Sequence, residues 1–193
     1  MPLAKRLGRP VADSRNTAVI RDLSPRSSES SPSNTLSARY GMGSFPFHTE
    51  TAYWRVPARY LFLYCVDPGA ANRPTLVLDL LGKLSISQKE ILSSEPWVVH
   101  SIRRPFLCRL IEKVSGGTVF RYDPVCMRPA SRKAASQAIL ERAVLQGESV
   151  QIPWRRGALL VVDNHRLLHG RAPAAFADPD RRLQRVLVAE DSV

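Results

Sequence analysis

The sequence predicts an all-β protein with minor helices, built as a barrel or as a two-sheet jelly roll. Many short, β-prone runs are separated by turn residues, and only one segment has a strong helical pattern. The strands do not alternate with helices, as they would in a parallel α/β fold. In a barrel or jelly roll one face of each strand points inward, where a ligand cavity can lie.

The chain divides into an expected arm and an expected folded domain. Residues 1–38 contain "RDLSPRSSESSPSNTLS", which is rich in Ser, Pro and Arg and has neither a helical nor an alternating period. Such a segment buries little apolar surface, so we expect it to be disordered. Residues 39–193 form the predicted domain, which begins with strands at 60–66 and 75–80, joined by the turn-rich loop "DPGAANRP".

The sequence predicts both helices and strands in the middle of the chain. A short helix is expected after Ser87, and 131–147 is the clearest helix, with a serine cap, an apolar stripe and Gly147 as its stop. We expect this helix to pack against one sheet. The remaining predicted strands are "WVVHSI" (97–102), a hairpin over 106–123 that turns at Gly116–Gly117, "GALLVVDN" (157–164) and "LQRVLVAE" (183–190).

The net charge of the chain and the distribution of its arginines indicate which kinds of partner it can bind. A formal charge of +11 over 193 residues suggests an anionic ligand, nucleic acid or an acidic membrane surface. Most of the arginines are scattered singly, and aromatic residues are not interleaved with them as a base-stacking platform would require, so an anionic small molecule is favoured over nucleic acid. A non-enzymatic basic binding protein remains an alternative.

Three sequence features bear on location. No apolar run approaches the ~20 residues of a membrane span, and the basic start is not followed by the apolar stretch of a signal peptide. The three cysteines, an odd and sparse set, fit reduced thiols. We therefore expect a cytoplasmic protein that does not contact a membrane.

A histidine and a glutamate lie two residues apart in the stretch "FPFHTETAYW". If this stretch is extended, His48 and Glu50 share one face, because side chains alternate with period two. Together they can offer an imidazole nitrogen and a carboxylate oxygen to one metal ion. A surface pair or a hydrogen-bonded core histidine would give the same pattern.

The second candidate stretch is "GALLVVDNHRLLHGR", followed by "DPDRRLQRVLV". Two histidines and one carboxylate leave three positions of an ion open, which is the arrangement of non-heme Fe(II) oxygenases. His165 and His169 could instead form a helical zinc pair. The strand before them and Gly170 after them argue against a helix, although a zinc-dependent hydrolase remains an alternative.

"FPFHTETA", "DNHRLLHGR" and "DRRLQR" together resemble the TauD/TfdA superfamily of Fe(II)/2-oxoglutarate-dependent dioxygenases, in particular its clavaminate-synthase-like branch. The resemblance covers about residues 36–191. It implies a double-stranded β-helix, a cupin-like jelly roll, and the cofactors Fe(II), 2-oxoglutarate as cosubstrate and O₂.

The resemblance also implies residue roles. His48, Glu50 and His169 would be the catalytic iron ligands. Arg181 and Thr75 would bind the C5 carboxylate of 2-oxoglutarate, and Arg185 would face the substrate or the C1 carboxylate. His165 would lie outside the metal site, and His100 is expected in the core.

Reaction and substrate are expected from the same resemblance. Related halogenases have a small residue in place of the carboxylate ligand, so Glu50 implies hydroxylation, desaturation or cyclisation. The implied substrate is a small metabolite with an anionic group, an amino acid or a derivative. The family usually carries a longer N-terminal section, so we expect a trimmed enzyme, a fragment, or a homo-oligomer or partner that completes the sheet.

Overall fold

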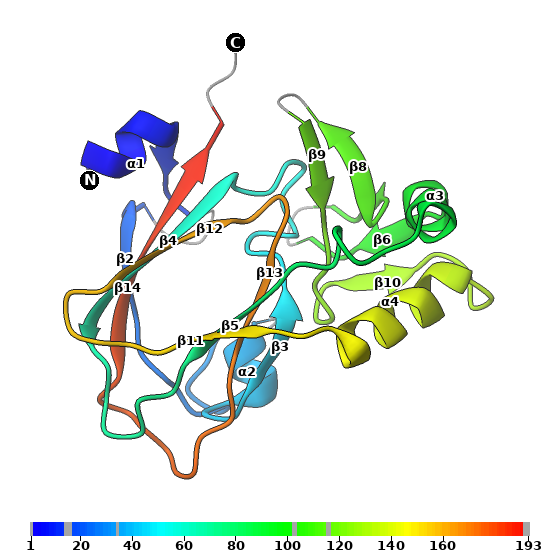
Figure 1. Ribbon diagram of the computed structural model, residues 1–193. Helices are drawn as coiled ribbons and strands as arrows, with labels where there is room; N and C mark the ends of the chain where they lie inside the picture. The colour runs from blue at the N-terminus through cyan, green and yellow to red at the C-terminus, as the bar shows by residue number, and fades with distance from the viewer. Residues whose placement is uncertain (1, 14–16, 34, 102–103, 115–116, 191–193) are drawn as a thin grey trace.

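Two antiparallel sheets form the centre of the protein in a computed structural model that describes residues 2–13, 17–33, 35–101, 104–114 and 117–190 (Figure 1). The larger sheet has the order β1-β14-β4-β12, and β2 also pairs with β14. The smaller sheet has the order β11-β5-β13-β3. The strands of the larger sheet are β1 (Arg9–Val11), β2 (Ile20–Leu23), β4 (Tyr60–Asp67), β12 (Leu159–Asp163) and β14 (Arg182–Ala189). Those of the smaller sheet are β3 (Phe45–His48), β5 (Thr75–Leu78), β11 (Val150–Ile152) and β13 (Leu168–Arg171).

Consecutive strands cross between these two sheets. The chain passes from β3 to β4 to β5, and later from β11 through β12 and β13 to β14, changing sheet at every step. This alternation is what a jelly roll requires, and the predicted fold class, a double-stranded β-helix with minor helices, is confirmed.

The segment between β5 and β11 forms a separate group of elements beside the two sheets (Figure 1). One sheet has the order β10-β6-β7 and a hairpin pairs β8 with β9. The bounds are α3 (Ile86–Ser94), β6 (Trp97–Val99), β7 (Phe106–Cys108), β8 (Ile111–Val114), β9 (Gly117–Phe120), β10 (Met127–Pro129) and α4 (Ala135–Gln146). The predicted turn at Gly116–Gly117 lies partly outside the described residues.

The helix expected over 131–147 is shorter than predicted. α4 begins at Ala135, and its cap residue Ala134 makes no side-chain cap hydrogen bond. The Glu95 carboxylate instead accepts hydrogen bonds from the backbone N–H groups of Ala135 and Ser136. The sequence could not show this cap because Glu95 is distant along the chain. Gly147 does end the helix, as predicted.

The arm expected over residues 1–38 contains regular elements, so that expectation is wrong for its described part. It holds α1 (Pro2–Leu7), β1, β2 and the start of α2 (Leu36–Tyr40). Both strands pair with β14, which lies at the far end of the sequence. β1 and β2 are only three and four residues long, too short to show a period, and their stability comes from this long-range pairing.

Two clusters of buried apolar residues pack against the central sheets. Leu61, Leu63 and Cys65 of β4 pack with Leu183 and Leu187 of β14, because alternate residues of each strand point the same way. A second cluster joins β5 to α4 and β6 through Leu78, Leu140 and Trp97. Among the described residues, no helix is long and apolar enough to cross a membrane.

Candidate functional site

A cavity of about 640 Å³ lies between the two central sheets. Side chains from β3, β5 and β13 line it on one side, and side chains from β4 and β14 line it on the other. Residues of the N-terminal segment, including Asp13 and Arg21, complete the wall. Each of the six site residues predicted from the sequence lines this cavity: His48, Glu50, Thr75, His169, Arg181 and Arg185.

His48 and His169 are brought together by the pairing of β3 with β13. Their Cα atoms are direct partners in the antiparallel register, and their rings lie 4.2 Å apart between centroids. Gly170 permits this close approach, because a Cβ atom at that position would lie 2.9 Å from the carbonyl oxygen of Phe45. The pairing therefore positions two imidazoles that are far apart in the sequence.

Glu50 does not continue the strand as expected, because β3 ends at His48 and Glu50 lies in the following turn. The next residue, Thr51, has a φ of 56°, a left-handed conformation that is rare for a β-branched residue. Asn164 fixes this turn: its Oδ1 accepts from the N–H of Glu50 at 2.8 Å, and its Nδ2 donates to the carbonyl oxygens of Glu50 and Ala58. Hydrogen bonding across the fold, and not strand alternation, therefore aims Glu50 at the cavity.

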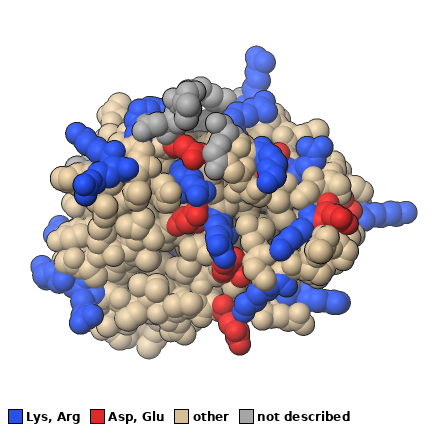
Figure 2. All heavy atoms as spheres, turned by 45° about the horizontal axis from the view of Figure 1, so that its top comes forward, with Lys and Arg blue, Asp and Glu red and all other residues tan. Residues whose placement is uncertain are grey.

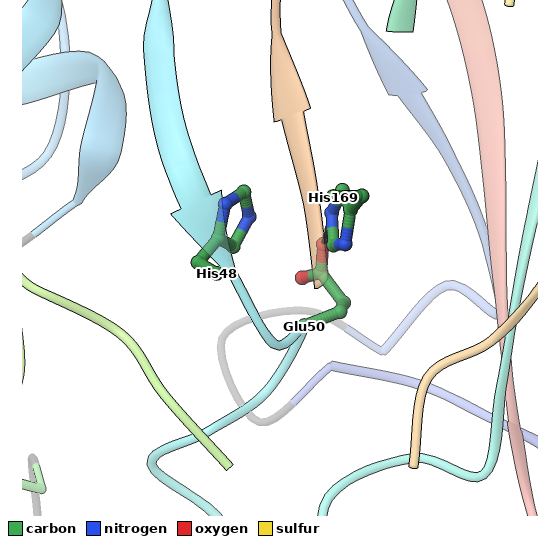
Figure 3. Close-up of side chains that lie close together, drawn as sticks. All are labelled: His48, Glu50 and His169. Atoms are coloured by element: carbon green, nitrogen blue, oxygen red, sulfur yellow. Dashed lines mark ion pairs between the residues drawn. The ribbon is translucent and has the colours of Figure 1, made fainter. Parts of the chain in front are cut away.

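The three side chains converge on one point (Figure 3). One ligand atom from each of His48, Glu50 and His169 lies within 4.8 Å of the others, and His169 Nε2 is 3.7 Å from Glu50 Oε2. The Nδ1 atom of His48 lies 3.0 Å from the carbonyl oxygen of Pro46. If Nδ1 donates this hydrogen bond, Nε2 is left with a lone pair for a metal, as in known histidine ligands.

The charges at this point suit a divalent cation. Burial would raise the pKa of Glu50, but the Arg185 guanidinium and the two imidazoles hold it well below its usual range. Burial, together with the nearby His48, lowers the pKa of His169 to about 4. At neutral pH the cluster therefore offers one carboxylate and a neutral imidazole, the protonation states that ligands of a metal need.

Arg181 and Thr75 form a second polar group in the cavity. Arg181 is 6 % exposed, and its Nε has no hydrogen-bond partner among the described residues. The Oγ1 atom of Thr75 accepts a hydrogen bond from Trp154 Nε1 at 3.1 Å. Because this bond uses a lone pair, the Thr75 hydroxyl hydrogen can still be donated to a ligand. The pair can therefore offer several donors to a carboxylate.

Two further buried arginines, missed by the sequence analysis, lie near Arg181. Burial and the neighbouring Arg73 lower the pKa of Arg181 to about 10, and burial and the same neighbour lower that of Arg171 to about 9. Arg171 donates to the carbonyl oxygens of Gly41 and Gly43, and Arg73 donates to those of Met42 and Gly43. These bonds hold the chain just before β3. Arg171 follows His169 by two residues in the "LHGR" motif, which was a signal for its place near the site. Nothing in the sequence indicated that Arg73 lies there.

Arg185 is engaged by two carboxylates. Its Nη1 donates to Glu50 Oε1 at 2.6 Å and its Nη2 donates to Asp13 Oδ2 at 2.9 Å. Burial alone would lower the pKa of Arg185, but the carboxylates of Glu50 and Asp13 raise it above its usual value. Asp13 lies in the segment expected to be disordered, so sequence reasoning missed it.

The other two histidines lie outside the cluster. The His165 Nε2 atom lies 2.9 Å from the carbonyl oxygen of Pro57, and the side chain is buried away from the cavity. The expectation that His100 is a core residue is wrong. It follows the short strand β6, is exposed and lines the cavity together with Asp123.

Basic side chains on the face shown in Figure 2 are dispersed, and acidic residues lie between several of them. Arg59, Arg156 and Arg166 each form an ion pair with an aspartate. The described residues visible in Figure 2 therefore form no continuous basic strip of the kind that nucleic-acid binding uses.

Comparison with known proteins finds sequence similarity to one family of dioxygenases. Residues 102–187 match the family model described as "Taurine catabolism dioxygenase TauD, TfdA family". A curated protein of Fischerella ambigua (strain UTEX 1903), 3-((Z)-2-isocyanoethenyl)-1H-indole synthase, is 27% identical over 172 residues. That match covers 75% of this chain and 63% of the relative.

Solved structures show the same fold. An asparagine oxygenase in complex with Fe(II), 2S,3S-3-hydroxyasparagine and succinate matches with a TM-score of 0.76 and 21% identity. A mutant of the non-heme iron oxygenase OrfP, in complex with (3S)-hydroxy-L-Arg, matches with a TM-score of 0.76 and 26% identity. These matches cover 98% and 99% of this chain but 63% of each of those chains. The chain is therefore similar to the TauD/TfdA family over residues 102–187, and it shares the fold of the solved iron oxygenases.

Proposed function

We propose that this chain is an Fe(II)- and 2-oxoglutarate-dependent oxygenase that oxidises a small, carboxylate-bearing metabolite, an amino acid or a derivative of one. The convergence of His48, Glu50 and His169 in a cavity that Arg181 and Thr75 also line carries this proposal. The donor set of two imidazoles and one carboxylate is that of non-heme Fe(II) oxygenases and leaves room for further ligands.

His48, Glu50 and His169 would hold the iron, which would supply the oxidation chemistry of 2-oxoglutarate and O₂. Arg181 would bind the far carboxylate of 2-oxoglutarate through its guanidinium, and Thr75 would donate its hydroxyl hydrogen to the same group. Asn164 would keep Glu50 oriented through its hydrogen bond to the Glu50 backbone. The overall reaction converts 2-oxoglutarate and O₂ to succinate and CO₂ while the substrate is oxidised.

The substrate proposal rests on charge and on the relatives. Arg185 and Arg21 line the cavity, so an anionic group on the substrate has cationic partners there. The similar solved proteins are an asparagine oxygenase and an oxygenase bound to a hydroxylated arginine, and the curated relative is the synthase of an indole isocyanide. Hydroxylation, desaturation and cyclisation all remain within the proposed reaction type.

Anaerobic titration tests the proposed function. Adding Fe(II) and then 2-oxoglutarate to the metal-free chain should produce the weak visible charge-transfer band of an Fe(II)·2-oxoglutarate complex. Zn(II) should occupy the same ligands without producing this band, because its filled d shell has no such transition. Iron-loaded protein that shows no band and releases no succinate in air would contradict the proposal.

Replacing Arg181 by glutamine should weaken 2-oxoglutarate binding while iron binding persists. A charge-assisted, two-point contact in a buried site would be replaced by neutral hydrogen bonds, so we expect a roughly 100-fold higher dissociation constant. The band measured against 2-oxoglutarate concentration gives this constant. Arg182→Gln is the matched control, because Arg182 is exposed and does not line the cavity. Equal weakening in both variants would show that general surface charge, and not Arg181, binds the cosubstrate.

A further inference from the structure

Arg21 and Arg185 are opposed across two strands that come from distant parts of the chain. β2 pairs with β14 in antiparallel register, and the Cα atoms of Arg21 and Arg185 are direct partners. Both side chains line the cavity. Two cationic side chains directly opposite each other repel unless an anion lies between them.

The Asp13 carboxylate supplies that anion. Its Oδ2 atom accepts from Arg21 Nη1 at 3.1 Å and from Arg185 Nη2 at 2.9 Å, so the two guanidiniums share one oxygen. Its Oδ1 atom accepts from the Tyr53 hydroxyl at 2.7 Å. Neither guanidinium therefore reaches both oxygens of Asp13 through the forked contact that binds carboxylates best.

Arg185 in particular keeps unused donor capacity. The residue is 7 % exposed, and its buried Nε has no hydrogen-bond partner among the described residues. Such an unpaired donor is costly in a buried site. Arg21 is more accessible, with 34 % of its side chain exposed. A ligand carboxylate could reach Arg21 first and then satisfy Arg185.

We propose that Arg21 and Arg185 form a paired-guanidinium site for the anionic group of the substrate, and that Asp13 is the exchangeable counter-ion that occupies this site when substrate is absent. This inference rests on the proposed function, which it deepens by assigning the substrate's anchor. The carboxylate of the substrate displaces that of Asp13, so Asp13 competes with substrate and Arg21 contributes directly to binding. A wall of the substrate site therefore comes from the N-terminal segment.

Calorimetric titration of the metal-free full chain with indole-3-propanoate tests the inference. This probe has the required carboxylate, and the curated relative makes an indole product. Asp13→Asn should bind the probe about tenfold more tightly than the unmodified chain, and Arg21→Gln about tenfold more weakly, each being roughly 1.4 kcal/mol. Indole-3-propanamide, which has no charge, should show neither change.

Matched controls lie on the same strands. Asp22 is exposed and accepts a hydrogen bond from Gln184, and Arg182 is exposed at the start of β14. Asp22→Asn and Arg182→Gln keep the same charge changes outside the cavity and should leave the affinity for the probe unchanged. Equal effects from these controls would overturn the inference in favour of long-range electrostatics.

Weaker probe binding in Asp13→Asn would also overturn the inference, because Asp13 would then hold Arg185 in place and not compete. Unchanged affinity for the probe in Arg21→Gln would overturn it as well. The same holds if neither the unmodified chain nor Asp13→Asn binds the probe. If Asp13→Asn fails to fold, phenylglyoxal labelling of the unmodified chain replaces it, and the probe should protect Arg21 but not Arg182. The Fe(II)·2-oxoglutarate band, recorded in the unmodified chain, separates a failure of this inference from a failure of the proposed function.

Discussion

Replacing His169 by alanine is expected to abolish the Fe(II)·2-oxoglutarate band and succinate release. The variant keeps only one imidazole and the Glu50 carboxylate, and it removes the nitrogen that lies 3.7 Å from Glu50. Loss of an outer hydrogen-bond partner alone costs roughly 10–100-fold in metal affinity, so loss of a ligand should cost more than about 100-fold. Equilibrium titration with Fe(II) under anaerobic conditions measures the affinity.

His100→Ala is the control for this substitution, because it removes an exposed imidazole that is outside the three-residue cluster. Its iron affinity should match that of the unmodified chain. A His169→Ala variant that still binds iron with unchanged affinity and keeps the band would refute the assigned metal site. The cavity would then need another function.

Replacing Asn164 by alanine should weaken both folding and iron binding. Asn164 is fully buried, and its amide makes three hydrogen bonds that join the Glu50 turn to Ala58. Their loss leaves the Glu50 N–H and the Ala58 carbonyl oxygen without this partner, while the Glu50 carbonyl oxygen still accepts from the Thr51 hydroxyl, so the free energy of unfolding should fall by about 2 kcal/mol. Because Glu50 is no longer held, iron affinity should fall by about tenfold or more.

Ser136→Ala separates the two effects of the Asn164 substitution. Ser136 is also fully buried and accepts a hydrogen bond from Trp97 Nε1, but it lies on α4 away from the cavity. Chemical denaturation should show a loss of stability in both variants, while only Asn164→Ala should lose iron affinity. If Ser136→Ala lowers the iron affinity equally, the effect of Asn164 is one of general stability.

The central strands and the candidate metal cluster could be predicted from the sequence. β4, β5 and β12 are mainly apolar runs, and β14 is rich in leucine and valine, so local composition is enough to identify all four as strands. The motifs around His48 and His169 placed both residues in one site but, because β3 ends at His48, strand alternation does not account for the position of Glu50. Its position depends on Asn164, which lies in the other half of the chain.

The N-terminal part of the site could not be predicted, because its structure depends on long-range pairing. β2 has four residues in a segment dominated by Ser, Pro and Arg, so it shows no local period. Arg21 can be recognised as a residue of the cavity only from the register of β2 with β14, which places it opposite Arg185. Asp13 likewise becomes a candidate only through its contacts with both arginines.

The central place of β14 in the larger sheet has a consequence for how the protein is made. β14 pairs with β1, β2 and β4, yet it is synthesised after every other described strand. β1 and β2 therefore have no partner strand until β14 has been synthesised. Pairing them with β14 closes a loop that spans most of the chain, which makes folding slow. Until then the edge of β4 that pairs with β14 stays open to other chains. Emerging chains of this protein should consequently depend on chaperones more than a fold with local pairing would.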